Sequence, residues 1–191
     1  MKESAIQQKF SLPEKKLMLK IARETLSHYL STNKILEYDE AILPDSLLDN
    51  ASVFVSLHKG RALRGCIGRM KPERQLYKNI QQEVINAASS DSRFPPVKYS
   101  ELPQICMEIS VLGPMVKISS PGEIELGKHG IYIRMGHASG TFLPQVARST
   151  GWTVEEFLGY CSKDKVGIGW DGWKNAEIFI YTAEVFSEKN C

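Results

Sequence analysis

Several features that would point directly to a function are missing from this sequence. It has no run of about 18 apolar residues, and the opening segment MKESAIQQKF has no apolar core, so we expect neither a membrane span nor an export signal. The 24 basic and 22 acidic residues leave a net charge of only +2, which argues against binding nucleic acid through bulk electrostatics. No glycine-rich segment has the spacing of a phosphate-binding loop. These absences favour an ordinary cytoplasmic globular protein.

Cysteine and histidine are also scarce and widely spaced. The four cysteines are Cys66, Cys106, Cys161 and Cys191. They include no Cys-x-x-Cys pair, which disfavours a disulfide scaffold or a zinc ribbon and favours reduced thiols. His129 and His137 lie eight positions apart without a nearby cysteine or a further histidine, which makes a metal site a weak interpretation. We therefore expect no metal and no cofactor.

The sequence does contain a mixture of helix and strand patterns. In SLPEKKLMLKIARETLSHYL, apolar residues recur every three or four positions, and Ser11 and Glu14 have the spacing of a capping box. Pro72 is expected to open a second helix, PERQLYKNIQQEVINAASS. Residues 51–57 and 105–111 mostly alternate between apolar and polar side chains, as strands do. The turn HKGR after the first of these strands predicts a hairpin in which Gly60 has a positive φ.

The second half of the chain continues this mixture. LPQVARSTG predicts a short helix that ends at Gly151, and Thr153 with Glu156 predicts a capping box for the next helix. AEIFIYTAEVF is apolar on both faces and is expected to be one strand inside the sheet. Hairpins and single strands, separated by helices of uneven length, predict an α+β fold with a mostly antiparallel sheet.

The segment LRGCIG, residues 63–68, is the strongest candidate for a functional site. Alternation along a strand predicts two faces, with Leu63, Gly65 and Ile67 on the core side and Arg64, Cys66 and Gly68 on the other. Arg64, Arg69 and Lys71 would favour the thiolate and lower the pKa of Cys66. The glycines would leave room for a ligand or another backbone to approach the thiol. The alternative, that Cys66 is merely a small buried side chain, stays open.

Three further residues are candidates near this thiol. Glu108, on the polar face of the predicted strand QICMEISVL, would pair with Arg64 or act as a base, or would simply face solvent. In the loop SDSRFPP, Asp91 and Arg93 are expected to clasp each other across a tight turn that the prolines stiffen. For this pair a structural role is favoured over direct chemistry.

Six motifs, in the same order along the chain, resemble the AMMECR family. They are LRGCIG, DSRFPP, EISVLGP, GKHGIYI, GTFLPQVA and GW…EEFL. The segment YCSKDKVGIGWDGWK is similar to a prokaryotic branch of this family called AmmeMemoRadiSam system protein A. The resemblance covers about residues 12 to 187.

The resemblance implies an architecture and a set of partners. It implies a single domain over residues 12–187 with two lobes of unequal size, the larger built from both chain ends around an antiparallel sheet and the smaller from the middle of the chain. Residues 1–11 and 188–191 would be flexible ends. LRGCIG would be the functional site, in or near a groove between the lobes. The partners would be a Memo-like protein, similar to metal-dependent dioxygenases, and a radical-SAM protein. The family has no settled reaction.

Two functions follow as hypotheses. In the first, the protein is an enzyme in which the Cys66 thiolate is a nucleophile or sulfur carrier, Arg64 stabilises charge and Glu108 transfers protons. In the second, it is a non-catalytic module that binds a substrate or partner and presents it to the Memo-like or radical-SAM protein. The candidate catalytic residues are Cys66 and Glu108. The candidate substrate-binding residues are Arg64, Gly65, Ile67, Gly68, Asp91, Arg93, His129 and Gln145.

Overall fold

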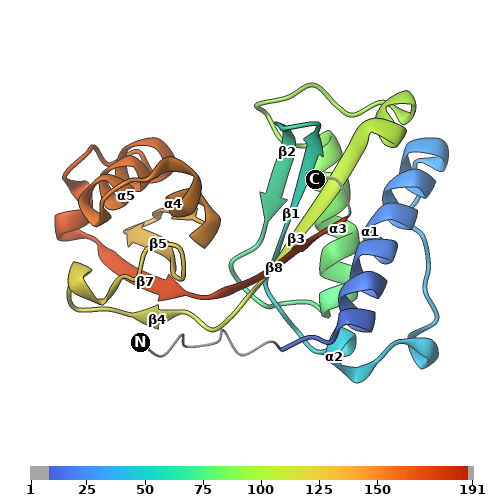
Figure 1. The fold of residues 1–191 in the computed structure, drawn as a ribbon, viewed down its shortest axis with the longest axis horizontal. Helices are drawn as coiled ribbons and strands as arrows, with labels where there is room; N and C mark the ends of the chain where they lie inside the picture. Colours follow the sequence, from blue (N-terminus) through green and yellow to red (C-terminus); the bar gives the residue numbers. More distant parts are fainter. Residues whose placement is uncertain (1–8, 189–191) are drawn as a thin grey trace. The chain divides into compact units, whose positions relative to one another are not determined.

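The computed structural model describes residues 9–188, which form two compact units (Figure 1). Unit 1 contains the described residues up to Leu112 and those from Glu184 onward, and unit 2 is Gly113–Ala183. Each unit contains a four-stranded sheet whose described pairings are antiparallel, together with helices. The predicted α+β fold with antiparallel sheets is therefore confirmed. Within residues 9–188, no helix has the length and apolar character needed to cross a membrane.

The sheet of unit 1 has the strand order β2-β1-β3-β8, so β2 is an edge strand. Its strands are β1 (Val53–Lys59), β2 (Ala62–Gly68), β3 (Ile105–Leu112) and β8 (Ala183–Ser187). The turn between β1 and β2 contains Gly60 at a φ of 59°, as the sequence predicts. Along β1, the residues Val53, Val55 and Leu57 are fully buried. This apolar side of the strand belongs to the hydrophobic core of unit 1.

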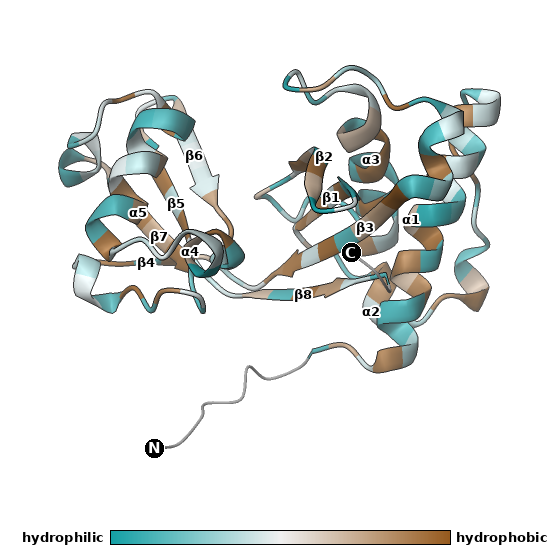
Figure 2. Ribbon diagram, turned by 45° about the horizontal axis from the view of Figure 1, so that its top comes forward, coloured by the Kyte–Doolittle hydropathy of each residue, from teal (hydrophilic) through white to brown (hydrophobic). Residues whose placement is uncertain are grey.

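Helices α1 (Leu12–Thr32) and α3 (Leu76–Ser89) pack on the sheet of unit 1 and on each other (Figure 1). The predicted capping box of Ser11 and Glu14 is present at the start of α1. Figure 2 shows hydrophobic and hydrophilic segments alternating around the turns of α1, as expected for a helix with one side against a core. The short helix α2 (Asp45–Leu48) and the 3-10 helices Glu40–Ile42 and Tyr99–Gln104 complete this unit.

The predicted start of the second helix is wrong. Helix α3 begins at Leu76 and not at Pro72. Residues just before it are held extended, because Asn50 and Gln75 form a β-bridge and the N–H of Ala51 bonds to the carbonyl of Arg74 at 3.3 Å. These long-range backbone bonds replace the helical bonds that the sequence pattern predicts.

Unit 2 has the strand order β4-β7-β5-β6. Its strands are β4 (Val116–Lys117), β5 (Gly130–Met135), β6 (Ala138–Phe142) and β7 (Glu177–Tyr181), and its helices are α4 (Pro144–Thr150), α5 (Val154–Tyr160), the π-helical turn Cys161–Val166 and the 3-10 helices Pro121–Glu123 and Gly172–Asn175. The predicted helix end at Gly151 and the predicted capping box of Thr153 and Glu156 are both confirmed. Partly buried aromatic residues pack against the core of this unit, and the ring centroids of Trp152 and Tyr160 lie 4.3 Å apart.

The prediction of one continuous strand over AEIFIYTAEVF is wrong. The run forms β7 and β8, which belong to different sheets, and the break falls at Thr182. The carbonyl of Thr182 accepts a hydrogen bond from the N–H of Gly113 at 2.8 Å. β7 is an interior strand of its sheet, whereas β8 is an edge strand.

The ends that the sequence predicts to be flexible lie mostly outside the described residues. Within residues 9–188, the side chain of Phe10 is only 2% exposed. The carboxylate of Glu188 accepts a hydrogen bond from Nε of Arg23 at 2.9 Å. Packed structure therefore extends slightly beyond the expected boundaries at both ends.

Candidate functional site

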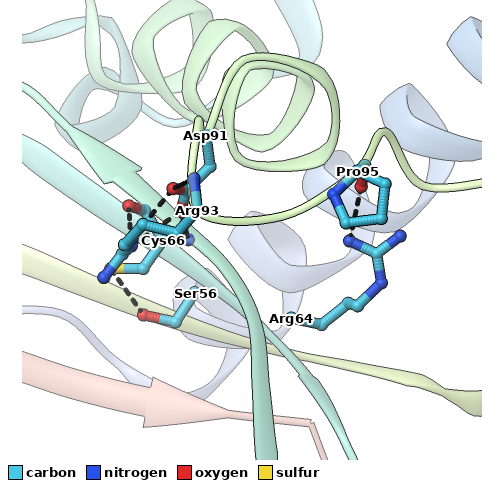
Figure 3. A network of polar contacts seen from close by, with 6 residues as sticks. All are labelled: Ser56, Arg64, Cys66, Asp91, Arg93 and Pro95. Carbon is cyan, nitrogen blue, oxygen red and sulfur yellow. Dashed lines mark hydrogen bonds and ion pairs between the residues drawn. The ribbon is translucent and has the colours of Figure 1, made fainter.

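The thiol of Cys66 lies in a row of polar side chains that crosses three strands. Cys66 on β2 pairs with Ser56 on β1, and Ser56 pairs with Glu108 on β3. Residues paired across strands share one face of a sheet, so Cys66, Ser56 and Glu108, here called the Cys66 row, lie on one face. The Ser56 hydroxyl donates a hydrogen bond to Sγ of Cys66 at 3.2 Å (Figure 3). The side chain of Ser56 is buried, with 6% of its surface exposed.

Asp91 and Arg93 hold the backbone of Cys66 at the open edge of β2 (Figure 3). The N–H of Cys66 donates to Oδ2 of Asp91 at 2.8 Å, and its carbonyl accepts from Nη2 of Arg93 at 3.1 Å. The two side chains also bond each other, with Nη2 of Arg93 2.6 Å from Oδ2 of Asp91. An edge strand leaves such backbone groups unpaired. This pair, here called the edge clasp, supplies the bonds that a neighbouring strand would supply.

The predicted clasp between Asp91 and Arg93 is therefore confirmed, and its target is the backbone of Cys66. The Arg93 guanidinium lowers the pKa of Asp91 to about 2 through its hydrogen bonds, and the N–H of Cys66 acts in the same direction. The side chain of Asp91 is 4% exposed, whereas that of Arg93 is 46% exposed. Both remain candidates for substrate binding, but their polar atoms are already engaged in holding β2.

The two glycines beside the thiol do not leave space for a ligand. A Cβ atom at Gly65 would lie 2.1 Å from the carbonyl oxygen of Ala87 in α3. A Cβ atom at Gly68 would lie 2.2 Å from the ring of Phe54. The alternative that another backbone approaches closely is confirmed at Gly65, where the backbone of α3 packs on β2, whereas the alternative that a ligand enters beside the glycines is wrong, because α3 and the Phe54 ring fill both positions. Gly65 allows close packing of β2 on α3.

A β-bulge changes the predicted faces at the start of this motif. The register shifts between Leu57 and His58, so that Leu63 pairs with His58 and Arg64 is left outside the pairing. Leu63 is 38% exposed, and the prediction that it seals against the core is wrong. Ile67 does pack against the core of unit 1, as its position predicts.

The guanidinium of Arg64 is directed at the segment after the clasp rather than at the thiol (Figure 3). It donates two hydrogen bonds to the carboxylate of Glu101, at 3.1 and 3.0 Å, and further bonds to the carbonyls of Pro95 and Pro96. The side chain of Arg64 is 13% exposed. The guanidinium also lowers the pKa of Glu101 to about 2. This geometry is that of a residue that fixes the loop, and it does not provide a free cation for substrate.

The pKa of Cys66 is raised rather than lowered. Burial of the thiol is the main cause, and the negative charges of Asp91 and Glu108 act in the same direction. The hydrogen bond from Ser56 and the charge of Arg93 oppose this rise without cancelling it. The predicted lowering of the pKa is wrong because burial outweighs the nearby positive charge, and because two of the three expected cations, Arg64 and Arg69, are paired with carboxylates. The guanidinium of Arg69, for example, bonds Glu83 at 3.0 Å.

The remaining candidates lie in unit 2. His129, which is 9% exposed, accepts a hydrogen bond at Nδ1 from the N–H of Glu125 at 3.1 Å. Gln145 lies in the first turn of α4. Sequence reasoning missed Ser56 and Glu101. The alternation of β1 puts Ser56 on its polar side, but the partner on β2 follows only from the register. No local pattern pairs Glu101 with Arg64.

Comparison with known proteins identifies the family of this chain. The family model AMMECR1 matches residues 19–186. The chain belongs to the AMMECR1 family. It is 38% identical to Protein Mbar_A1807 of Methanosarcina barkeri over 184 residues, which cover 92% of this chain and 91% of that protein. It is also 38% identical to Protein MK0488 of Methanopyrus kandleri, with 95% and 92% covered.

The fold is also shared with a solved member of similar size. The crystal structure of the uncharacterised protein PH0010 from Pyrococcus horikoshii superposes with a TM-score of 0.91 at 33% identity, covering 96% of this chain and 95% of that one. The family resemblance of the ordered motifs is thereby confirmed. Because the AMMECR1 relatives named here carry no described activity, the chemistry of this AMMECR1 chain must be argued from its own site.

The cysteines of this AMMECR1 chain are not all free thiols. Cys66 and Cys161 are free, but Cys106 is disulfide-bonded, so the expectation of four reduced thiols is wrong. Cys161 belongs to the core of unit 2 and has no exposed surface. Burial raises its pKa to about 12. Cys161 is therefore a suitable internal reference for the reactivity of Cys66.

Iodoacetamide is expected to label the native protein slowly at neutral pH. Because the pKa of Cys66 is raised, mainly by burial, its thiol is mostly protonated near neutral pH, and the thiolate is the form that reacts. Peptide mass spectrometry over a pH series should show Cys66 labelled mainly above the ordinary thiol pKa of about 8.5, and Cys161 labelled only at higher pH still. Half-maximal labelling of Cys66 below about pH 8.5, the ordinary value for a free thiol, would contradict the raised pKa.

Proposed function

We propose that this AMMECR1 protein is a binding module whose recognition surface is the Cys66 row together with the clasped edge of β2. The observation that carries the proposal is that the clasp holds the Cys66 backbone at both its N–H and its carbonyl while burial keeps the thiol protonated. A backbone fixed in this way is preorganised for binding, because less conformational entropy is lost when a partner arrives.

The polar atoms of the row suit recognition. The thiol is a weak donor, and the Glu108 carboxylate is an acceptor when ionised. Glu108 is only partly buried, so it can contact a partner without first moving out of a core. A carboxylate on β3 and a protonated thiol on β2, on one face of the sheet, favour a ligand that offers hydrogen-bond donors or a positive charge to β3 and a soft or apolar group to β2.

The same geometry disfavours Glu108 as a direct base for the thiol. Cys66 and Glu108 lie on strands that are separated by β1. Adjacent strands are about 4.8 Å apart, so the two residues are separated by roughly 10 Å. A general base must be within about 3 Å of the proton it takes or be linked by one water molecule. Ser56 on β1 pairs with both residues and lies between them.

A second candidate function is catalysis by the thiol, as the sequence first suggests. It is favoured by one observation, the hydrogen bond from Ser56 to Sγ, which acts with the charge of Arg93 to lower the pKa of Cys66. A bound ligand that neutralises Glu108 would remove one of the charges that raises this pKa. In this alternative the thiol becomes a nucleophile only in the complex.

The partners that we propose for the module are the Memo-like protein and the radical-SAM protein suggested by the family branch. The test is to purify both partners from the same organism and to measure their affinity for this chain by isothermal titration calorimetry. Glu108→Gln should weaken binding about tenfold, because a charge-assisted hydrogen bond contributes about 1.5 kcal/mol or more. The affinity of Cys66→Ser for each partner should stay within a few fold of that of the wild type. Cys161→Ser is a control for thiol loss away from the row.

The outcomes separate the two functions. Full binding by Cys66→Ser, with loss of turnover of a substrate that the assembled system converts, would favour the catalytic thiol. Absence of binding to either partner, with native melting temperatures for all variants, would rule out the proposed role with these partners.

A further inference from the structure

A pocket in unit 1 lies apart from the Cys66 row and includes none of its residues. It has a volume of about 520 Å³ and lies between residues 35–38, which follow α1, and the side chains at the start of α3. Small-molecule sites have volumes of roughly 300–1,000 Å³. The pocket is therefore large enough for a metabolite, and its chemistry can be read from the side chains that line it.

Hydrogen bonds to the surrounding protein fix the walls of this pocket. The hydroxyl of Tyr77 donates to Glu40 at 2.7 Å, and that of Tyr38 donates to Glu24 at 2.7 Å. The amide nitrogen of Gln81 donates to the carbonyl of Leu36 at 2.6 Å. Burial and the hydrogen bond to Glu24 raise the pKa of Tyr38, so this phenol stays protonated. The two aromatic rings are thus held in place before any ligand binds.

Two opposite charges at the pocket have no partner among residues 9–188. Arg74 and Glu37 both line the pocket, and no ion pair or side-chain hydrogen bond joins either to another described residue. Lys78 differs, because its ammonium bonds Glu40 at 2.8 Å. The pocket therefore offers one available cation and one available anion beside two aromatic rings. Ile35 and Leu36 add apolar surface.

We propose that this pocket binds a free α-amino acid with an aromatic side chain. Its carboxylate would bond the guanidinium of Arg74, which matches a carboxylate through two parallel donors. Its ammonium would bond the carboxylate of Glu37. Its ring would pack on the tyrosines and on the apolar residues of 35–38, because aromatic rings combine large apolar contact with favourable ring geometry. A zwitterion satisfies both unpaired charges at once, whereas a simple anion or cation satisfies one.

The test uses L-phenylalanine and two analogues that each lack one charge. Saturation-transfer NMR and calorimetry should show millimolar or tighter binding of L-phenylalanine to the full chain. Phenylalaninamide, which has no carboxylate, and N-acetylphenylalanine, which has no ammonium, should each bind about tenfold more weakly.

Matched variants assign each charge to its residue. Arg74→Gln should bind L-phenylalanine about tenfold more weakly and should no longer distinguish it from phenylalaninamide. Glu37→Gln should no longer distinguish L-phenylalanine from N-acetylphenylalanine. Arg61→Gln, which removes an exposed cation from the β1–β2 turn, should bind like the wild type. The proposal is overturned if L-phenylalanine gives no signal, or if Arg74→Gln and Arg61→Gln bind it equally well.

Discussion

Gly65→Ala is expected to destabilise unit 1 by at least about 3 kcal/mol, the upper part of the usual cost of overpacking. The new Cβ atom would lie 2.1 Å from a backbone oxygen of α3, so the clash cannot be relieved by rotating a side chain. The helix or the edge strand must shift instead. Hydrogen exchange followed by mass spectrometry should show lost protection in β1, β2 and α3, and urea unfolding should show a lower midpoint.

Two other glycines serve as controls for this result. Gly122→Ala should change stability by no more than about 0.5 kcal/mol, because the nearest atom to its Cβ would be 3.5 Å away and its φ is not left-handed. In Gly68→Ala, the new Cβ atom would meet the ring of Phe54. Because this obstacle is a side chain, adding Phe54→Leu should restore part of the lost stability. An unchanged unfolding midpoint for Gly65→Ala would mean that β2 does not pack on α3 as closely as described.

Asp91→Asn is expected to lower the stability of unit 1 by about 2 kcal/mol. Removing one partner of a buried ion pair costs about 3–5 kcal/mol, but Arg93 is half exposed and water can solvate its freed guanidinium. The amide can still accept one hydrogen bond, so the loss falls below that range. Thermal unfolding by circular dichroism measures it. Asp171→Asn is the matched control, because Asp171 and Lys174 are both exposed, and its effect should stay within about 0.5 kcal/mol.

The same substitution should also change association and acid sensitivity. With the clasp weakened, the N–H and carbonyl of Cys66 are exposed to another chain for part of the time, so light scattering should show concentration-dependent association. Asp91 and Glu101 both have pKa values lowered to about 2, so the stability they contribute is complete above their ordinary values and is lost as the pH falls from about 4.5 towards 2. The variant should therefore lose less melting temperature over this range than the wild type. A wild-type melting temperature that is constant over this range would contradict both lowered pKa values.

The sequence predicted features that depend on neighbouring residues and missed those that depend on distant ones. The capping boxes of Ser11 and Thr153 are completed within three residues, and both are present. The clasp between Asp91 and Arg93 is equally local, but its two bonds to Cys66 span 25 and 27 residues and follow only from the fold. Alternation alone cannot reveal a bulge, so it predicts the wrong environments for Leu63 and Arg64.

The candidate site also depends on residues that are distant in the sequence. The basic residues near Cys66 in the sequence favour a thiolate, but the pKa of a thiol depends on its burial and on whether the nearby cations are already paired. Glu83 and Glu101, which engage Arg69 and Arg64, are 14 and 37 residues away in the chain. Gly65 and Gly68 suggested an open approach because the sequence cannot show that Ala87 and Phe54 occupy those positions.

The insertion of unit 2 between β3 and β8 has a consequence for the order of events on the ribosome. Strand β8 neighbours β3 in the completed sheet, yet about 70 residues separate them in the chain. At a synthesis rate of about 5–20 residues per second, β3 is exposed on that side for roughly 4–14 s before β8 is made. During this interval the nascent sheet ends in an apolar strand with unpaired backbone groups. A chaperone that binds nascent chains would meet its best target at β3, and truncation before Glu184 should release chains that aggregate rather than a smaller folded unit.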